Sequence, residues 1–76
     1  MSQIKQEALL KDWRFETVKS ARSLIVVGHV YGHPRFAEGQ LIHSSLIVQL
    51  KMRDENNGFA ETLHTYYRLE GGNHNG

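Results

Sequence analysis

The fold is decided by residues 24–39, which read LIVVGHVYGHPRFAEG. Leu24–Val27 is apolar on both faces and rich in β-branched residues, which is typical of a strand inside a sheet. This strand continues to Tyr31 and is followed by the loop 32–39. Pro34, the only proline of the chain, cannot donate a hydrogen bond to a neighbouring strand, so the strand must end near it. We therefore expect a central strand that leads into a glycine-bounded loop.

Two further strands are predicted on the C-terminal side of this loop. Residues 41–51 and 59–69 alternate between two sets of side chains, as strands with two different faces do. Asn57-Gly58 lies between them and is a strong hairpin signal. In residues 59–69 the alternation places Phe59, Leu63, Tyr67 and Leu69 on one face, and Ala60, Thr62, His64, Tyr66 and Arg68 on a more polar face.

On the N-terminal side the pattern changes its period. Ser2–Lys11 is predicted to be a short helix, because Ser2 is a suitable N-cap and Ile4 and Ala8 are four residues apart. Residues 13–18 then alternate with the spacing of a strand and carry aromatic side chains on one face.

The whole chain is expected to form one small domain. The sequence predicts an α+β fold that is mainly β, with a short N-terminal helix followed by about four antiparallel strands in a meander. This domain would extend over residues 1–70, and residues 71–76 would be a flexible tail.

Composition limits what kind of protein this chain can be. The 76 residues hold nine Lys and Arg against eight Asp and Glu, a balance that does not suit DNA binding through phosphate neutralisation alone. The absence of cysteine fits a reducing compartment and excludes thiolate metal sites. The longest apolar run has four residues and the N-terminus lacks an apolar signal core, so we expect a cytoplasmic protein with no membrane span. A domain this short buries only about 60% of its unfolded surface, so oligomerisation is the expected source of further stability.

The glycine-bounded loop is the first candidate for a binding site. Between two permissive glycines, backbone N–H groups can turn toward an anion, and Arg35 adds a planar fork suited to phosphate. His33 offers a hydrogen-bond donor and Phe36 a stacking face. The alternative is an ordinary hairpin connection, in which Pro34 sets the turn and Phe36 fills the core.

The polar face of residues 59–69 is the second candidate. His64, Tyr66 and Arg68 would line up at the period of a strand, so that a base could stack on Tyr66 and Arg68 could hold a phosphate. The alternative is a face of the sheet that is simply solvated.

No signature of catalysis or of metal binding stands out. His29 and His33 are four residues apart, but they straddle a strand end and lose the geometry that this spacing has on a helix. Ser44 and Ser45 lie near histidines, but the chain has no Gly-x-Ser-x-Gly elbow. We therefore expect a binding protein rather than an enzyme, with no cofactor and no metal.

Three segments resemble a group of very small phage and prophage proteins: Gly28–Gly39, Ile42–Ile47 and Glu61–Leu69. The shared pattern is a strand into His-Pro-Arg-Phe, an acidic residue and Gly, then Thr-Ser and an apolar strand, then Thr, a polar residue, Thr, any residue and Tyr. The anti-Thoeris sponge proteins are similar in this pattern. They sequester cyclic ADP-ribose-type signals, and some also bind cyclic oligonucleotides, so that bacterial immune effectors are never switched on.

The resemblance implies a phage counter-defence protein in the host cytoplasm that sequesters a cyclic nucleotide immune signal without cleaving it. Its pocket would use Arg35, His64 and Arg68, and Phe36 or Tyr66 would stack on a base. A symmetric homo-oligomer would place such pockets between subunits.

Two residues depart from the pattern. Ser44 stands in place of a threonine, and His64 stands in place of an asparagine that would contact the ligand. The departure at His64 implies a different ligand or a loss of binding.

Other functions remain open at this point. One is an inhibitor that blocks a host defence protein by direct binding, in the manner of an anti-CRISPR protein. A second is a small nucleic-acid-binding module, and a third is a structural or assembly protein of a phage or mobile element.

Overall fold

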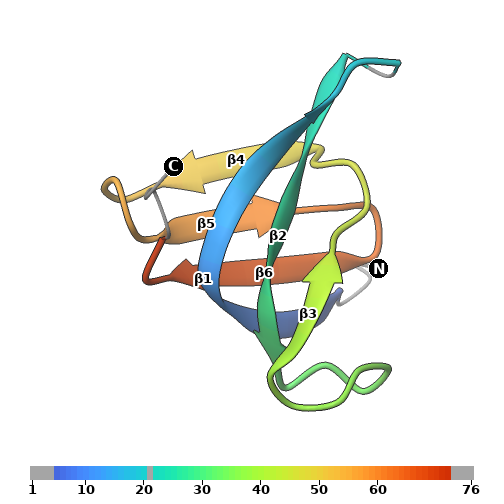
Figure 1. The fold of residues 1–76 in the computed structure, drawn as a ribbon, viewed down its shortest axis with the longest axis vertical. Helices are drawn as coiled ribbons and strands as arrows, with labels where there is room; N and C mark the ends of the chain where they lie inside the picture. The colour runs from blue at the N-terminus through green and yellow to red at the C-terminus, as the bar shows by residue number, and fades with distance from the viewer. Residues whose placement is uncertain (1–4, 21, 73–76) are drawn as a thin grey trace.

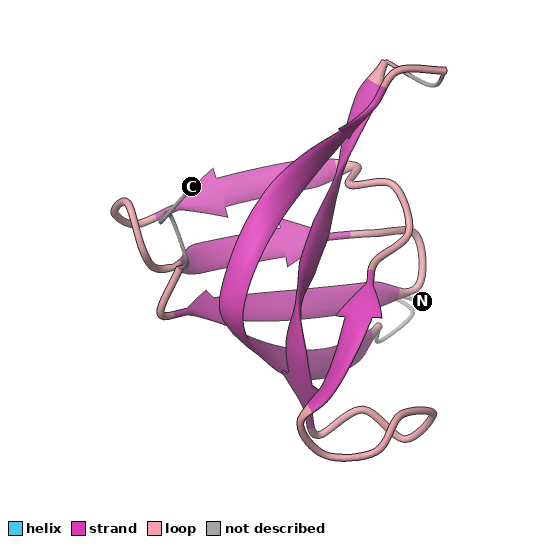
Figure 2. Ribbon diagram, viewed as in Figure 1, coloured by secondary structure: helices cyan, strands magenta, loops and turns pink. Residues whose placement is uncertain are grey.

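The structure is a computed structural model that describes residues 5–20 and 22–72, and the regular structure in these ranges is all β-strand (Figures 1 and 2). The strands are β1 (Gln6–Val18), β2 (Ser23–Tyr31), β3 (Gln40–His43), β4 (Gln49–Met52), β5 (Gly58–Glu61) and β6 (Thr65–Glu70). They form one six-stranded sheet in the order β3-β2-β1-β6-β5-β4. Within the described ranges, no helix has the length and apolar character needed to cross a membrane.

Two antiparallel meanders meet at β1. The first is β1-β2-β3 and the second is β4-β5-β6, and the parallel pairing of β1 with β6 joins them into a mixed sheet. Only Gln6–Lys11 of β1 pairs with β6, whereas β1 stays paired with β2 as far as Val18. Figure 1 shows β1 and β2 crossing the β4-β5-β6 meander at a steep angle.

A bulge in β1 produces this change of direction. The register with β2 shifts between Lys11 and Arg14, and Asp12 has a φ of 52°, in the left-handed region. Such a bulge bends the strand and increases its twist. Gly28 lies against it, because a Cβ there would be only 2.9 Å from the Lys11 carbonyl oxygen and from Leu10 Cγ.

Residues 44–48, here called the crossing segment, connect the two edge strands. Ser44 N donates to Val26 O (2.8 Å) and Ile47 N to Leu24 O (2.9 Å), so the segment first follows β2. Val48 N then donates to Glu61 O of β5 (2.7 Å). The sheet therefore curls so far that the crossing segment contacts β2 near one edge of the sheet and β5 near the other.

The core lies inside this curl. Its largest fully buried side chains are those of Trp13, Leu10, Leu69, Val26, Val27 and Val30. The Trp13 ring donates through Nε1 to Asn56 O (3.1 Å), which ties the turn after β4 to the core. Phe36 of the glycine-bounded loop packs against this cluster.

The predicted N-terminal helix is wrong. Gln6–Lys11 belongs to β1, Lys5 has no regular structure, and residues 1–4 lie outside the described ranges. Ala8 and Leu10 are buried while Glu7 and Lys11 are exposed, which is the period of a strand. A helix of this length is marginal without packing, whereas pairing with β2 and β6 gives this stretch partners on both sides.

The prediction of about four antiparallel strands in a meander is also wrong. Residues 41–51 are divided between β3 and β4 by the crossing segment. Residues 59–69 are divided by a turn in which Thr62 N donates to Thr65 O (2.9 Å) and Thr62 Oγ1 accepts from Thr65 N (3.2 Å). Each predicted strand thus becomes two, and the parallel contact between β1 and β6 replaces a simple meander.

Two other predictions are confirmed. Leu24–Val27 lies in β2, which pairs with a strand on each side and ends at Tyr31, directly before the loop 32–39. The hairpin signalled by Asn57-Gly58 is formed by β4 and β5, with its turn over residues 53–57 and Gly58 as the first residue of β5.

Candidate functional site

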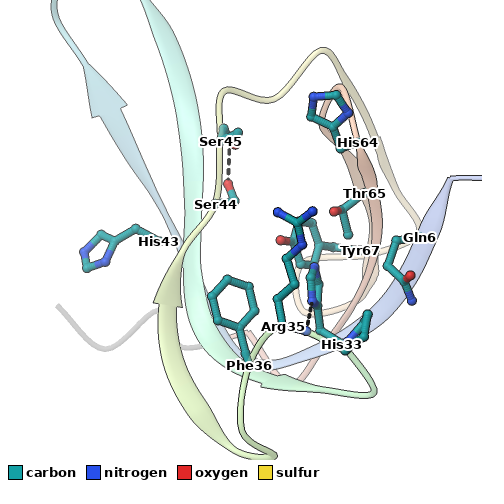
Figure 3. A pocket seen from close by; sticks show the side chains of 11 residues that line it. Gln6, His33, Arg35, Phe36, His43, Ser44, Ser45, His64, Thr65 and Tyr67 are labelled. Carbon is teal, nitrogen blue, oxygen red and sulfur yellow. Dashed lines mark hydrogen bonds between the residues drawn. The ribbon is translucent and has the colours of Figure 1, made fainter.

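A cavity of about 420 Å³ lies where the glycine-bounded loop meets the crossing segment and the start of β6 (Figure 3). This volume falls in the lower part of the range of about 300–1,000 Å³ that is typical of small-molecule sites. The cavity is lined by Gln6, His33, Pro34, Arg35, Phe36, His43, Ser44, Ser45, His64, Thr65 and Tyr67.

The loop is held in shape by its own polar groups. Gly32 and Gly39 have φ values of 77° and 79°, a left-handed conformation that glycine adopts without steric cost. Glu38 Oε1 accepts from Gly32 N (2.6 Å), and Gly39 N donates to Val30 O (2.7 Å). These bonds fix the conformation of the loop, so that His33, Pro34, Arg35 and Phe36 line the cavity.

His33 forms part of the aromatic wall of the cavity. Its ring centroid lies 4.7 Å from that of Phe36 and 6.5 Å from that of Tyr67. The planes of the His33 and Tyr67 rings are 20° from parallel. His33 Nδ1 accepts from Arg35 N (3.1 Å), which assigns the ring proton to Nε2. Burial, and then the charge of Arg35, lower the pKa of His33. The imidazole is therefore neutral at pH 7 and can donate from Nε2.

Arg35 is the cation of the cavity. Figure 3 shows its guanidinium reaching into the cavity, between the Ser44 and Thr65 side chains in this view. Among the described residues the guanidinium has no hydrogen-bond or ion-pair partner, and no carboxylate lines the cavity. An exposed, unopposed guanidinium is suited to bind the two oxygens of a phosphate or carboxylate at once.

Hydroxyl groups complete the lining of the cavity. Ser44 is buried, and its Oγ accepts from Val26 N (2.9 Å) and donates to Ser45 O (2.7 Å). Burial raises the pKa of Tyr67, so its hydroxyl stays protonated at neutral pH. Because the Ser44 hydroxyl is bonded to backbone groups rather than to a histidine, it is not arranged as a nucleophile. The lining can hold a ligand through hydrogen bonds.

Four of the six predicted site residues lie on this cavity: His33, Arg35, Phe36 and His64. The other two, Tyr66 and Arg68, do not line it. Tyr66 packs on Phe59 with ring centroids 5.2 Å apart, and Arg68 Nε is 3.4 Å from Glu70 Oε2. In β6 it is Thr65 and Tyr67 that face the cavity.

The turn at residues 62–64 explains this division. The prediction treated 59–69 as one strand, which put His64, Tyr66 and Arg68 on one face. His64 instead lies in the turn, and the pairing of Ala60 with Tyr67 puts Phe59 on the face of Arg68. Alternation within β6 is enough to put Tyr67 and Tyr66 on different faces of the sheet. That Tyr67 and His64 line the same cavity depends on the turn.

Sequence reasoning also missed residues that come from distant parts of the chain. Gln6 of β1 lines the cavity, together with Ser44 and Ser45 of the crossing segment. His43 contributes to the lining as well, but Figure 3 shows its ring pointing away. Over residues 5–20 and 22–72, no group of three or more His, Cys, Asp or Glu side chains could hold a metal ion.

The cavity combines one unopposed cation, an aromatic wall and a set of hydroxyls, and these groups suit a ligand with an anionic group and a planar ring. Comparison of the chain with protein-family models, with curated proteins and with solved structures gives no match.

Proposed function

We propose that the protein binds a small nucleotide-like anion in this cavity and holds it unchanged. The observation that carries the proposal is the guanidinium of Arg35, which has no partner among the described residues and lies beside the rings of His33 and Phe36. An unopposed cation next to an aromatic wall matches a molecule that joins a phosphate to a base.

Five of the residues that line the cavity have a role in this proposal. Arg35 holds a phosphate through paired hydrogen bonds. The base lies against the exposed surface of the His33 and Phe36 rings. Stacking on aromatic rings tolerates any base. Tyr67 and Thr65 donate hydrogen bonds to ribose or phosphate oxygens.

We further propose that the ligand is a cyclic nucleotide immune signal, which the protein sequesters as a phage counter-defence protein. This step rests on the resemblance to the anti-Thoeris sponge proteins. Sequestration acts by mass action, so it requires abundance and tight binding, and nanomolar affinity corresponds to about 12 kcal/mol. A cyclic nucleotide presents a phosphate and a base. The cavity offers a partner for each, the Arg35 guanidinium for the phosphate and the rings of His33 and Phe36 for the base.

The test is a calorimetric titration of the purified protein with cyclic ADP-ribose isomers and with cyclic di- and trinucleotides. We expect one ligand class to bind tightly and to be recovered intact after the protein is denatured by heat. Arg35→Ala should weaken this binding by about a hundredfold, and Arg53→Ala, which removes an exposed arginine from the turn after β4, should leave it unchanged. Absence of heat across the whole panel would contradict the proposal, and so would recovery of a cleaved ligand.

A second candidate function is favoured by the opposite face of the sheet. One side chain from each of five strands forms a row in direct cross-strand register: Tyr31, Leu9, Arg68, Phe59 and Lys51. Aromatic and basic side chains that alternate on a sheet can stack bases and hold the backbone of a single strand. This candidate predicts that a labelled oligonucleotide binds more weakly as salt rises, that Phe59→Ala abolishes its binding, and that Arg35→Ala does not.

A further inference from the structure

The ring of His33 is bonded to the backbone of the residue that carries the cation of the cavity. Its Nδ1 accepts from Arg35 N (3.1 Å), a bond here called the latch. Among the described residues it is the only hydrogen bond that this N–H makes. A side chain that accepts from the N–H two residues further on has the geometry of an Asx turn, which Asn and Asp usually form. His33 therefore fixes the backbone at Arg35 as an asparagine would.

Few other contacts fix the position of Arg35. Phe36 N donates to His33 O, but at 3.3 Å this bond is long. Pro34 has no N–H to contribute. The side chain of Arg35 is exposed, and its guanidinium has no partner among the described residues. The direction in which the guanidinium reaches thus depends strongly on the latch.

The latch requires a neutral imidazole. Nδ1 accepts through its lone pair, and protonation places a hydrogen on that lone pair. Two N–H groups would then face each other across 3.1 Å, so the ring would have to turn or leave its place. The same ring packs against Phe36 and Tyr67. Its movement would therefore disturb the aromatic wall as well as Arg35.

We propose that the latch must be closed for a ligand to bind, so that protonation of His33 opens the latch and releases the ligand. The regulation rests on the proposed function, because it acts on binding in the same cavity. Burial and then the charge of Arg35 lower the pKa of His33 below its usual 6.5. Binding is therefore fully present at pH 7 and is lost as the pH falls through this lowered pKa.

The charges around the ring do not stabilise an imidazolium. The titratable or charged side chains of the surrounding elements are Arg35 and Glu38 of the loop, Tyr67 of β6, His64 of the turn at residues 62–64, and His43 at the end of β3. Glu38 is bonded to the backbone of Gly32, and Figure 3 shows the His43 ring pointing away from the cavity. Burial raises the pKa of Tyr67, which keeps its hydroxyl neutral. Arg35 and, in acid, His64 carry charge of the same sign as the imidazolium.

One effect of protonation has the opposite sign, because an imidazolium attracts an anionic ligand. Arg35 is exposed, so this attraction is screened by solvent, and an ion pair of that kind changes affinity by no more than about fivefold. Nε2 carries a proton in both states, so protonation adds no hydrogen bond to the ligand. Loss of a stacking ring alone weakens binding by about five- to a hundredfold. The net effect of acid is therefore weaker binding.

The first test needs no ligand. The imidazole of His33 and the backbone amide of Arg35 are followed by NMR in the full chain between about pH 5 and 8. We expect the two to titrate with the same midpoint. The amide of Gly39, which donates to Val30 O (2.7 Å) at the other end of the loop, is the matched control and should not follow this titration. A His33 ring that titrates while the Arg35 amide stays unchanged would overturn the proposal.

The second test is a titration with cyclic di-AMP, whose phosphodiesters keep their charge over this range of pH. We expect the affinity to fall by about tenfold or more from pH 7.5 to pH 5. Because a ligand and a proton that oppose each other do so reciprocally, cyclic di-AMP should lower the pKa of His33 further. Tighter binding in acid, or a raised pKa of His33 in the complex, would overturn the proposal. Failure of cyclic di-AMP to bind at pH 7.5 would count against the proposed function, and the first test would still decide the latch.

Two substitutions separate the latch from the ring. His33→Asn removes the ring but keeps an oxygen that can accept from Arg35 N and does not titrate, whereas His33→Ala removes both. We expect His33→Asn to bind cyclic di-AMP about tenfold more tightly than His33→Ala, with the same affinity at both ends of the pH range. Circular dichroism shows that both variants are folded. Equal affinity of the two variants, or a pH dependence that persists in His33→Asn, would overturn the proposal.

Discussion

Two connections between antiparallel strands differ in what their charged residues do. In the turn 53–57, Asp54 Oδ1 accepts hydrogen bonds from Asn56 N (2.8 Å) and Asn57 N (3.0 Å). In the loop 32–39, Glu38 likewise binds the loop backbone, but the Arg35 guanidinium has no partner among the described residues. The comparison shows that each connection is stabilised by an acidic side chain bound to its own backbone, and that Arg35 differs from the exposed Arg53 because it lines a cavity.

The largest expected effect is on binding at Arg35. Hydrogen bonds to a charged group contribute about 1.5–3 kcal/mol, so Arg35→Ala should weaken ligand binding by about a hundredfold. Arg35→Lys keeps the charge but loses the planar fork, and it should lie between the wild type and Arg35→Ala. The free energy of unfolding should change by less than about 0.5 kcal/mol in both variants, as measured by urea denaturation. Equal affinity in all three proteins would contradict the assignment.

Glycines at the two connections should differ in their effect on stability. A Cβ at Gly58 would lie 2.7 Å from Lys51 O and 2.8 Å from Met52 Cα, so Gly58→Ala must displace backbone and should cost about 2–3 kcal/mol. A Cβ at Gly32 meets nothing within 4 Å, and only the φ of 77° opposes it, at a cost of about 1 kcal/mol. Denaturant unfolding of the two variants measures this difference. A larger loss for Gly32→Ala would contradict the account.

The internal bonds of the turn 53–57 give the next prediction. Asp54→Ala removes the acceptor of the turn's backbone N–H groups and should lower the melting temperature by several degrees, with no change in ligand affinity. Asp54→Asn keeps an acceptor oxygen and should lose less. Thermal unfolding followed by circular dichroism, combined with a titration of each variant, checks both statements. A loss of affinity in Asp54→Ala would show that the two connections are coupled.

Features that depend on neighbouring residues could be predicted from the sequence, and features that depend on contacts between distant segments could not. The strand at Leu24–Val27, the loop after it and the hairpin at Asn57-Gly58 follow from local residue types. The path of Gln6–Lys11 does not, because it is set by pairing with β2 and with the distant β6.

The candidate site shows the same limit. The loop residues Arg35 and His33 could be named from their own segment, with its two glycines and its proline. The partners Gln6, Ser44 and Tyr67 come from other strands and meet the loop only because the sheet curls. The sequence favours Tyr66 over Tyr67, because the turn at residues 62–64 has no glycine or proline to mark it and residues 59–69 look like one strand.

The smallest expected effect is a dependence of stability on pH. Burial and Arg35 lower the pKa of His33 below its usual 6.5, so the unfolded chain binds this proton more readily. The stability contributed by neutral His33 is therefore present above pH 6.5 and lost as the pH falls below it. Chiefly through the hydrogen bonds from Asn56 and Asn57, the pKa of Asp54 is also lowered, from 3.8, and its contribution is lost only in stronger acid.

Urea denaturation at a series of pH values can separate the two groups. His33→Gln should reduce the loss of stability as the pH falls through about 6.5, and Asp54→Asn should leave that loss unchanged. An identical pH profile in wild type and His33→Gln would contradict the placement of the imidazole between Phe36 and Tyr67.

Side-chain NMR tests whether a ligand occupies the cavity beside Arg35. The Nε–Hε resonances of Arg35 and Arg53 can be followed as cyclic ADP-ribose is added, together with the backbone resonances of the whole chain. We expect saturable shifts for Arg35, His33 and Thr65, and none for Arg53. Shifts centred on Phe59 and Arg68, or no shifts with any cyclic nucleotide, would contradict this expectation.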